Sequence, residues 1–191
     1  MSDEVRQKWD GIYGGEGKAG AGARVLLENS HLLPKQGKAL ELACGRGANA
    51  LFLARAGLET HAWDISPVAI ASLQAVAEQQ GLIVHGEACD IMQSPPPPDS
   101  FDVIVVSHFL ERGLISLLRT ALRPQGLLFY QTFTRSRVSD HGPSNPEFRL
   151  ADNELLGLCA GMQVLVYREE GKLGDVERGF RDLALIVAQK I

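Results

Sequence analysis

The chain has 191 residues, a length that suits one domain with a real hydrophobic core. Hydrophobic residues make up 45% of it and charged residues 22%, which excludes a disordered or fibrous protein. The formal net charge is −4 and the basic residues are scattered, so nucleic acids and anionic membranes are not expected partners.

The N-terminus and the cysteines indicate a cytoplasmic protein. The first ten residues are charged and lack the apolar stretch of a signal peptide, and no segment approaches the roughly 18 apolar residues of a membrane span. Cys44, Cys89 and Cys159 lie far apart, with no C-x-x-C pair among them. This usage predicts reduced thiols, and no metal site is expected.

At the N-terminus, a helix is predicted over residues 3–13, with Ser2 as its cap and acids in its first turn. A glycine-rich run over 14–22 follows, where glycine permits motion and unusual dihedral angles. A second short helix is expected to end near Pro34, before the first strand.

From residue 38 onward, apolar runs and helical patterns alternate, bounded by glycine and proline. This alternation implies a parallel sheet that is covered on both faces by helices through right-handed crossovers. The predicted strands are 39–43, 58–63, 82–88, 101–107 and 127–133, and the predicted helices are 47–56, 67–80 and 114–122.

The C-terminal part begins with a polar loop over 134–150, which is long enough to suggest a functional role. A helix is predicted over 152–160. Two β-rich runs, 162–169 and 181–189, are joined by a short polar connection and suit an antiparallel hairpin at the edge of the sheet.

Ligands of such sheets bind at the carboxyl ends of the strands, so the turns found there are the places to look for chemistry. After the first strand, Gly45 and Gly47 would let the backbone approach a ligand closely. Glu41 is a carboxylate inside an otherwise apolar strand, which is costly to bury unless it is paired. A positively charged ligand group would supply that partner, and a solvated strand edge is the alternative.

The next two turns also carry acids. Asp64 follows the second strand, where an acid can accept both ribose hydroxyls of a nucleoside; helix capping is the alternative, but Ser66 is better suited to that. After the third strand, Asp90 could meet an adenine amino group with Ile91 against the ring, or Asp90 is a solvated loop residue. In combination, the three turns predict a nucleoside site.

These turns resemble those of the class I S-adenosylmethionine-dependent methyltransferases. The first motif of that family reads acid-x-Gly-x-Gly-x-Gly, and residues 41–47 read ELACGRG, with Ala43 a mild departure that adds one methyl group. Asp64 matches the ribose acid and Asp90 lies in the adenine motif. The resemblance covers about 40–133 and implies a Rossmann-like α/β fold: a seven-stranded, mostly parallel sheet with an antiparallel C-terminal strand and helices on both faces.

Within the class, GRGANALFLARAGLETHAWDIS (45–66) looks most like the tellurite-resistance and thiopurine-type branch, whose members methylate small, often soft nucleophiles. W-D-x-x-Y, from Trp9 to Tyr13, fits the lid-like leading helix of that branch. The resemblance implies one methyltransferase domain over 1–191, made of an N-terminal helical lid (1–34), a cofactor-binding core (38–133) and an acceptor-side loop, helix and hairpin (134–191).

The resemblance implies S-adenosylmethionine as the cofactor and methyl transfer to a small-molecule acceptor, such as a thiol or a selenium or tellurium oxyanion. His108, at the end of the fourth strand, is a candidate to orient or deprotonate the acceptor, or it only caps the strand; Tyr13 is the other catalytic candidate. Arg135, Arg137, His141 and Arg149 are candidates to recognise an anionic acceptor, with solvated loop charges as the alternative. The residues expected to bind the cofactor are Trp9, Tyr13, Glu41, Ala43, Cys44, Gly45, Gly47, Asn49, Asp64, Ile65, Cys89, Asp90, Ile91 and Ser107.

Two other functions fit the same residues. Gly45-x-Gly47-x-x-Ala50 with Asp64 downstream satisfies the fingerprint of a nicotinamide-dependent oxidoreductase, although Glu41 lies where a pyrophosphate would gain nothing from an acid. A protein that binds S-adenosylmethionine without catalysis is the second alternative, because methyl transfer has no indispensable catalytic residue.

Overall fold

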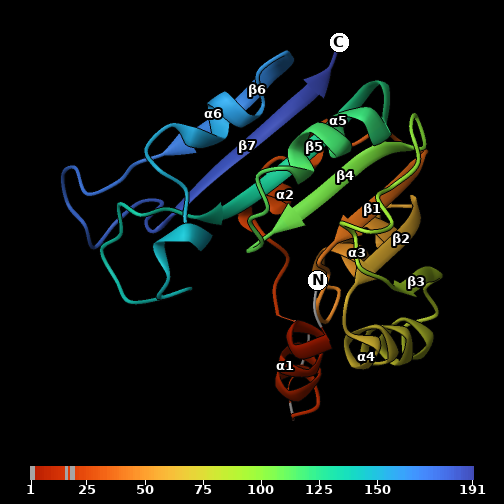
Figure 1. Ribbon diagram of the computed structural model, residues 1–191. Coiled ribbons are helices and arrows are strands. Elements are labelled where there is room, and N and C mark those ends of the chain that lie inside the picture. Colours follow the sequence, from red (N-terminus) through yellow and green to blue (C-terminus); the bar gives the residue numbers. More distant parts are fainter. Residues whose placement is uncertain (1–2, 16, 18–19) are drawn as a thin grey trace.

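The computed structural model describes residues 3–15, 17 and 20–191. Ser2, the predicted helix cap, and residues 16, 18 and 19 of the glycine-rich run lie outside the described residues. Seven strands form one sheet in the order β3-β2-β1-β4-β5-β7-β6 (Figure 1). This confirms the predicted seven-stranded Rossmann-like α/β fold.

The strands form where apolar runs predicted them. β1 to β5 pair in parallel, and β7 is antiparallel to both β5 and β6, which confirms the C-terminal hairpin with β6 at the sheet edge. The strands are β1 (Lys38–Leu42), β2 (Glu59–Asp64), β3 (Val84–Ala88), β4 (Phe101–Ser107), β5 (Leu122–Phe133), β6 (Met162–Glu169) and β7 (Leu183–Lys190). The helices are α1 (Asp3–Tyr13), α2 (Arg24–Leu27), α3 (Ala48–Arg55), α4 (Pro67–Gln79), α5 (Leu114–Ala121) and α6 (Glu154–Leu158), with 3₁₀ turns η1 (Ser30–Leu32) and η2 (Pro146–Phe148).

One strand begins earlier than predicted. β5 starts at Leu122 instead of residue 127, and Phe101 pairs with Leu122 before the register shifts and the regular pairing resumes. Pro124 lies in the shifted stretch, and its lack of an N–H group interrupts the ladder of hydrogen bonds. A bulge of this kind has no apolar periodicity, so the sequence pattern located only the regular part of the strand.

Helices cover both faces of the sheet, as predicted (Figure 1). Side chains alternate along each strand, so Val103 and Val105 of β4 pack with α2 and α3, whereas Ile104 and Val106 pack with α5 and α6. α4 packs with α3 on the same side as α2. Among the described residues, no helix has the length and apolar character needed to cross a membrane.

The sheet is less fully covered at β2 and β3. On one face, α4 packs so closely on β3 that an added Cβ at Gly86 would lie 2.8 Å from Ile70 Cγ2. Residues 89–100, which connect β3 to β4, contain no helix. The opposite face of this part of the sheet is therefore partly open to solvent, and His85 is exposed there.

α1 lies beside α4, near the carboxyl ends of the strands (Figure 1). The hydroxyl of Ser66 donates to a carboxylate oxygen of Asp10 in α1 and also accepts from Ala69 N at 3.2 Å, which caps α4. Arg46 donates to the carbonyl oxygens of Tyr13 and Gly15 at 3.1 and 2.8 Å. These bonds tie the leading helix to the turns that follow β1 and β2.

The turn after β1 has an unusual backbone at Ala43, whose φ is +50°. Ala43 occupies the first glycine position of the acid-x-Gly-x-Gly-x-Gly motif. The cost of alanine at this position therefore lies in the backbone conformation rather than in the space that its methyl group occupies. A left-handed conformation is about 1–2 kcal/mol less favourable for an L-residue than the right-handed one, whereas glycine adopts it freely.

We predict that Ala43→Gly raises the free energy of unfolding by about 1 kcal/mol, because relief of this strain outweighs the greater entropy of the unfolded glycine chain. Urea denaturation followed by circular dichroism measures the change. Ala71→Gly, at an exposed position within α4, is the matched control and should lower the stability by about 1 kcal/mol. A loss of stability in Ala43→Gly as well would contradict the prediction.

Candidate functional site

A cavity of about 370 Å³ opens at the carboxyl ends of β1, β2 and β4, a size that suits a small-molecule ligand. Its walls come from the turns that follow these strands, from the start of α3 and from α1. The predicted site residues that line it are Trp9, Tyr13, Glu41, Ala43, Cys44, Gly45, Gly47, Asn49, Asp64, Ile65, Cys89, Ile91, Ser107 and His108.

Asp90 is the predicted site residue that the structure does not bring into this cavity. It lines an adjoining, smaller hollow together with Asp3 and Arg6 of α1. Its carboxylate accepts from Met92 N at 3.0 Å and from Gln93 Nε2 at 3.2 Å. The residues on either side of Asp90, Cys89 and Ile91, line the main cavity instead.

The two glycines of the turn are required for different reasons. Gly45 and Gly47 have φ values of +51° and +74°, so both adopt the left-handed conformation. A Cβ at Gly45 would lie 2.6 Å from Tyr13 Oη, inside the cavity wall, whereas a Cβ at Gly47 would lie 2.3 Å from Leu73 Cδ1 of α4. Gly45 therefore shapes the cavity, and Gly47 allows α3 and α4 to pack.

Glu41 is buried at the base of the cavity, with 2% of its surface exposed. Its oxygens accept from Asn49 Nδ2 and from Ala50 N, both at 2.7 Å. The sequence led us to expect a cationic ligand group as its partner, but the protein itself already supplies two donors. Burial nevertheless raises the pKa of Glu41 to about 8, so a cation placed nearby would favour ionisation.

Asp64 joins two of the turns. Its Oδ2 accepts from Gly45 N at 2.8 Å and its Oδ1 from Ser66 N at 2.9 Å. Burial raises its pKa, since only 5% of the residue is exposed. The helix cap of α4 is Ser66, as the sequence indicated, so the carboxylate of Asp64 is not used for that purpose.

Asn49 connects three segments around the cavity. Its Oδ1 accepts from Ala23 N at 2.7 Å, and its Nδ2 donates to Glu41 and, at 3.1 Å, to Ser107 Oγ. Nearby, Gln131 Oε1 accepts from Val25 N at 3.0 Å. The segment that leads into α2 is thereby fixed against the ends of β1, β4 and β5.

An aromatic pair from α1 forms the outer wall. The rings of Trp9 and Tyr13 are stacked, with centroids 5.7 Å apart, and both residues line the cavity. Burial, together with the charge of Asp64, raises the pKa of Tyr13 to about 12. The phenol therefore keeps its proton at neutral pH and can donate a hydrogen bond, but it is not a base.

Arg46 is a cavity residue that the sequence reasoning missed. Its guanidinium lies 5.8 Å from the ring centroid of Tyr13 and binds the backbone at the end of α1. A charged residue between Gly45 and Gly47 is the sequence feature that could have indicated this role. Its partners, Tyr13 and Gly15, lie about 30 residues earlier in the chain, so the sequence alone does not reveal them. Other lining residues that were not predicted are Gly20, Ala21, Ala23, Ala48 and Phe109.

His108 lies at the rim, at the end of β4. Its φ is +56°, and its backbone N–H donates to Gln131 O at 2.9 Å. Burial, followed by the nearby His141, lowers the pKa of His108, so its imidazole is neutral at neutral pH. A neutral imidazole at a cavity rim can accept a proton or orient an acceptor.

The charged residues of the 134–150 loop bind the loop itself. Arg149 is only 2% exposed, and its guanidinium donates to the backbone carbonyls of Thr134, Pro143 and His141. This burial argues against the expected role of Arg149 in recognising an anionic acceptor, because each of its three nitrogens already donates to a backbone carbonyl and the side chain is closed to solvent. Arg135 and Arg137 form ion pairs with acids of the same loop, at 3.6 and 3.4 Å.

Comparison with known proteins shows similarities to methyltransferases. Residues 39–126 match the family described as "Methyltransferase domain". The chain is 34% identical to Hemagglutinin 1 of Eikenella corrodens over an alignment of 140 residues, and this alignment covers 69% of this chain and 46% of that protein. It is 28% identical over 147 residues to the probable S-adenosyl-L-methionine-dependent methyltransferase TehB of Haemophilus influenzae, which covers 74% and 50%.

A third relative is the ribosomal RNA small subunit methyltransferase C of Alcanivorax borkumensis, 28% identical over 141 residues that cover 68% of this chain and 42% of that protein. This chain thus spans about half the length of the curated relatives it matches. The crystal structure of TehB from Haemophilus influenzae has the same fold, with a TM-score of 0.72 at 23% identity over 97% of this chain and 67% of that one.

These matches favour the methyltransferase interpretation over the nicotinamide oxidoreductase, and they include the branch that the sequence indicated. The chain is therefore similar to S-adenosylmethionine-dependent methyltransferases, TehB among them, and its residues 39–126 match the methyltransferase domain.

Proposed function

We propose that this chain binds S-adenosylmethionine in the cavity and transfers its methyl group to a small-molecule acceptor with a soft nucleophilic atom, such as a thiol or a selenium or tellurium oxyanion. The observation that carries the proposal is the pair of buried carboxylates, Glu41 and Asp64, beside the glycine turn of one cavity. The match to the methyltransferase family supports it.

The residues of the cavity fit the chemical groups of this cofactor. Each carboxylate oxygen has two acceptor sites, so Asp64 can accept from ribose hydroxyls as well as from Gly45 and Ser66. Glu41 offers negative charge for a cationic group, and Ile65 and Ile91 offer apolar surface for a base. Bound there, the cofactor would supply a methyl group already activated by a sulfonium.

The contribution of the protein is to position the acceptor and exclude water, which can lower a barrier by roughly 7–11 kcal/mol in favourable cases. The stacked rings of Trp9 and Tyr13 can close the outer side and favour a cation by up to about 2 kcal/mol. Neutral His108 can hold the acceptor or take its proton, and the Tyr13 phenol can donate to it.

A small, soft acceptor is favoured by the resemblance of residues 45–66 to the tellurite-resistance and thiopurine-type branch, whose members methylate small, often soft nucleophiles. RNA is the acceptor that the name of another relative suggests. The net charge of −4 does not favour it, because RNA binding relies on basic residues that neutralise phosphates.

The proposal is tested by binding and then by transfer. S-adenosylhomocysteine should raise the melting temperature of the protein and NADH should not. Cofactor with a labelled methyl group should then label thiols, selenite or tellurite in a panel that also includes halides, small amines and ribosomal RNA. Stabilisation by NADH alone would overturn the cofactor assignment, labelling of RNA alone would overturn the acceptor, and binding without any transfer would indicate a non-catalytic binder.

We predict that Asp64→Ala weakens S-adenosylhomocysteine binding at least tenfold in isothermal titration calorimetry, because the ribose loses its acceptor. The same change should lower the free energy of unfolding by about 1–3 kcal/mol, since two backbone N–H groups lose theirs. Asp152→Ala, in an exposed loop, is the control for both measurements. Unchanged affinity in folded Asp64→Ala would contradict the ribose assignment.

A second prediction concerns pH. The pKa of Glu41 is raised to about 8 in the folded protein, whereas an unfolded glutamate has a pKa of about 4.3. The folded state therefore holds the proton more tightly, and the stability that Glu41 contributes is lost as the pH rises from about 5 to 8. A cationic cofactor favours the ionised form, so its affinity should rise over the same interval, by up to tenfold per pH unit.

Glu41→Gln isolates both effects, because its side chain cannot ionise. The difference in free energy of unfolding between the wild type and this variant, measured in urea between pH 5.5 and 8.5, should shrink as the pH rises. The rise in cofactor affinity with pH should be absent from the variant. A difference in stability that is independent of pH would show that Glu41 is ionised throughout.

A further inference from the structure

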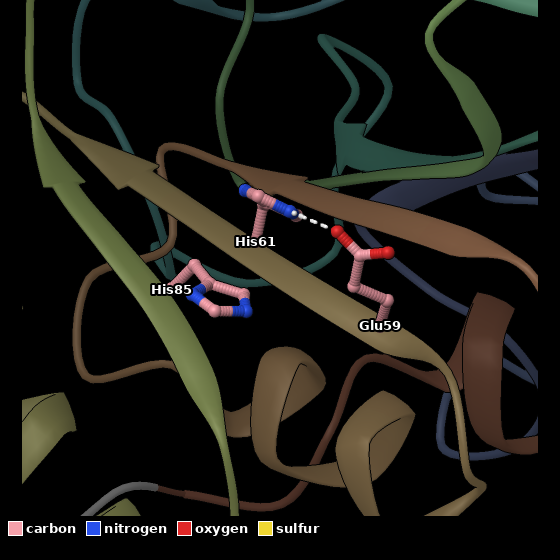
Figure 2. Close-up of side chains that lie close together, drawn as sticks. All are labelled: Glu59, His61 and His85. Atoms are coloured by element: carbon pink, nitrogen blue, oxygen red, sulfur yellow. Dashed lines mark hydrogen bonds and ion pairs between the residues drawn. The ribbon is translucent and has the colours of Figure 1, made fainter.

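Three side chains with metal-binding atoms lie together outside the cavity, on the open face of β2 and β3 (Figure 2). Glu59 and His61 come from β2, and His85 comes from β3. One nitrogen or oxygen atom from each lies within 4.8 Å of the others. None of the three lines the cavity, so they are separate from the site described above.

The register of the sheet brings these residues together. His61 and His85 are direct partners in the parallel pairing of β2 with β3, so their side chains leave the same face. Their ring centroids are 4.8 Å apart. Glu59 lies two residues before His61 in β2, so its side chain leaves the same face of the sheet. Its Oε1 lies 3.1 Å from His61 Nε2, and a dashed line marks this contact in Figure 2.

Two of the three side chains in the cluster are open to solvent, and the third is held by packing. Glu59 and His85 are exposed, and His61 packs edge-on against the Phe101 ring at 5.8 Å between centroids. Lys38 Nζ lies 3.3 Å from Glu59 Oε1 and would compete with a metal ion for that oxygen. The second carboxylate oxygen and the imidazole nitrogens remain suited to a metal.

We propose that Glu59, His61 and His85 bind one divalent transition-metal ion of the zinc, nickel or copper type. Two imidazoles and one carboxylate match the preference of these ions, whereas magnesium and calcium prefer oxygen ligands alone. Three protein ligands leave at least one coordination position, which water can fill on this exposed face. The cysteine spacing predicted no metal site, and the three ligands of this cluster lie on two strands that α4 separates in the sequence.

The position of the cluster indicates what the ion does. β3 is an edge strand, and its partner on the inner side is β2. An ion held by both strands links the edge of the sheet to its interior, and it stabilises the folded state by an amount that grows with the logarithm of the free metal concentration above the dissociation constant. The cluster belongs to the amino-terminal and middle parts of the strands, whereas the cavity lies at their carboxyl ends, so cofactor binding is not affected.

Isothermal titration calorimetry with zinc chloride and, separately, nickel chloride tests the site on untagged protein in a weakly coordinating buffer. We expect one ion per chain for each metal, and magnesium chloride should give no binding heat. His61→Ala and His85→Ala should each weaken zinc binding at least tenfold. His31→Ala, at an exposed histidine elsewhere, and Cys89→Ser, at a half-buried thiol, are matched controls that should bind zinc like the wild type.

A thermal measurement provides an independent readout. Zinc should raise the melting temperature of the wild type and of His31→Ala but not of His85→Ala, whose substitution lies on the surface and should leave the fold intact. S-adenosylhomocysteine should still stabilise His85→Ala, so failure of the metal site is distinguishable from failure of the cofactor site. Absence of saturable zinc binding, or wild-type affinity in both histidine variants, would overturn the proposal.

Discussion

One carboxylate, that of Asp64, joins the turns that form the floor of the cavity. It accepts from Gly45 N and Ser66 N, so the glycine turn after β1 and the start of α4 are held at fixed positions. Ser66 in turn binds Asp10 of α1, and Arg46 binds the backbone at Tyr13. Removal of this carboxylate would free backbone N–H groups on both sides, and the aromatic wall would lose its support.

The second buried carboxylate works against the stability of the unliganded protein. Glu41 has its two donors, but burial and the nearby charge of Asp64 still oppose its ionisation. A cationic ligand would relieve this cost, because it adds a positive charge where the protein has placed negative ones. The arrangement therefore couples ligand binding to proton release, and the same residues that weaken the empty fold strengthen the complex.

Most of the fold could be predicted from apolar patterns, because buried parallel strands such as β4 are apolar on both faces and glycine or proline marks their ends. The turn residues of the cavity could be predicted for the same reason: parallel strands bring their carboxyl ends to one edge. Long-range partners could not be predicted. The bonds that Arg46 makes to α1, the burial of Arg149 and the bulge in β5 depend on how distant segments meet.

The cluster of Glu59, His61 and His85 illustrates the same limit. Nothing in the two separate strands says which residues will face each other, because α4 lies between them in the sequence and the register is set by packing. The connection from β3 to β4 then decides whether the pair is covered. Residues 89–100 run from Cys89, at the cavity, to Phe101 without forming a helix. The same short connection that supplies part of the cavity wall thus leaves the two histidines within reach of solvent, and of any ion dissolved in it.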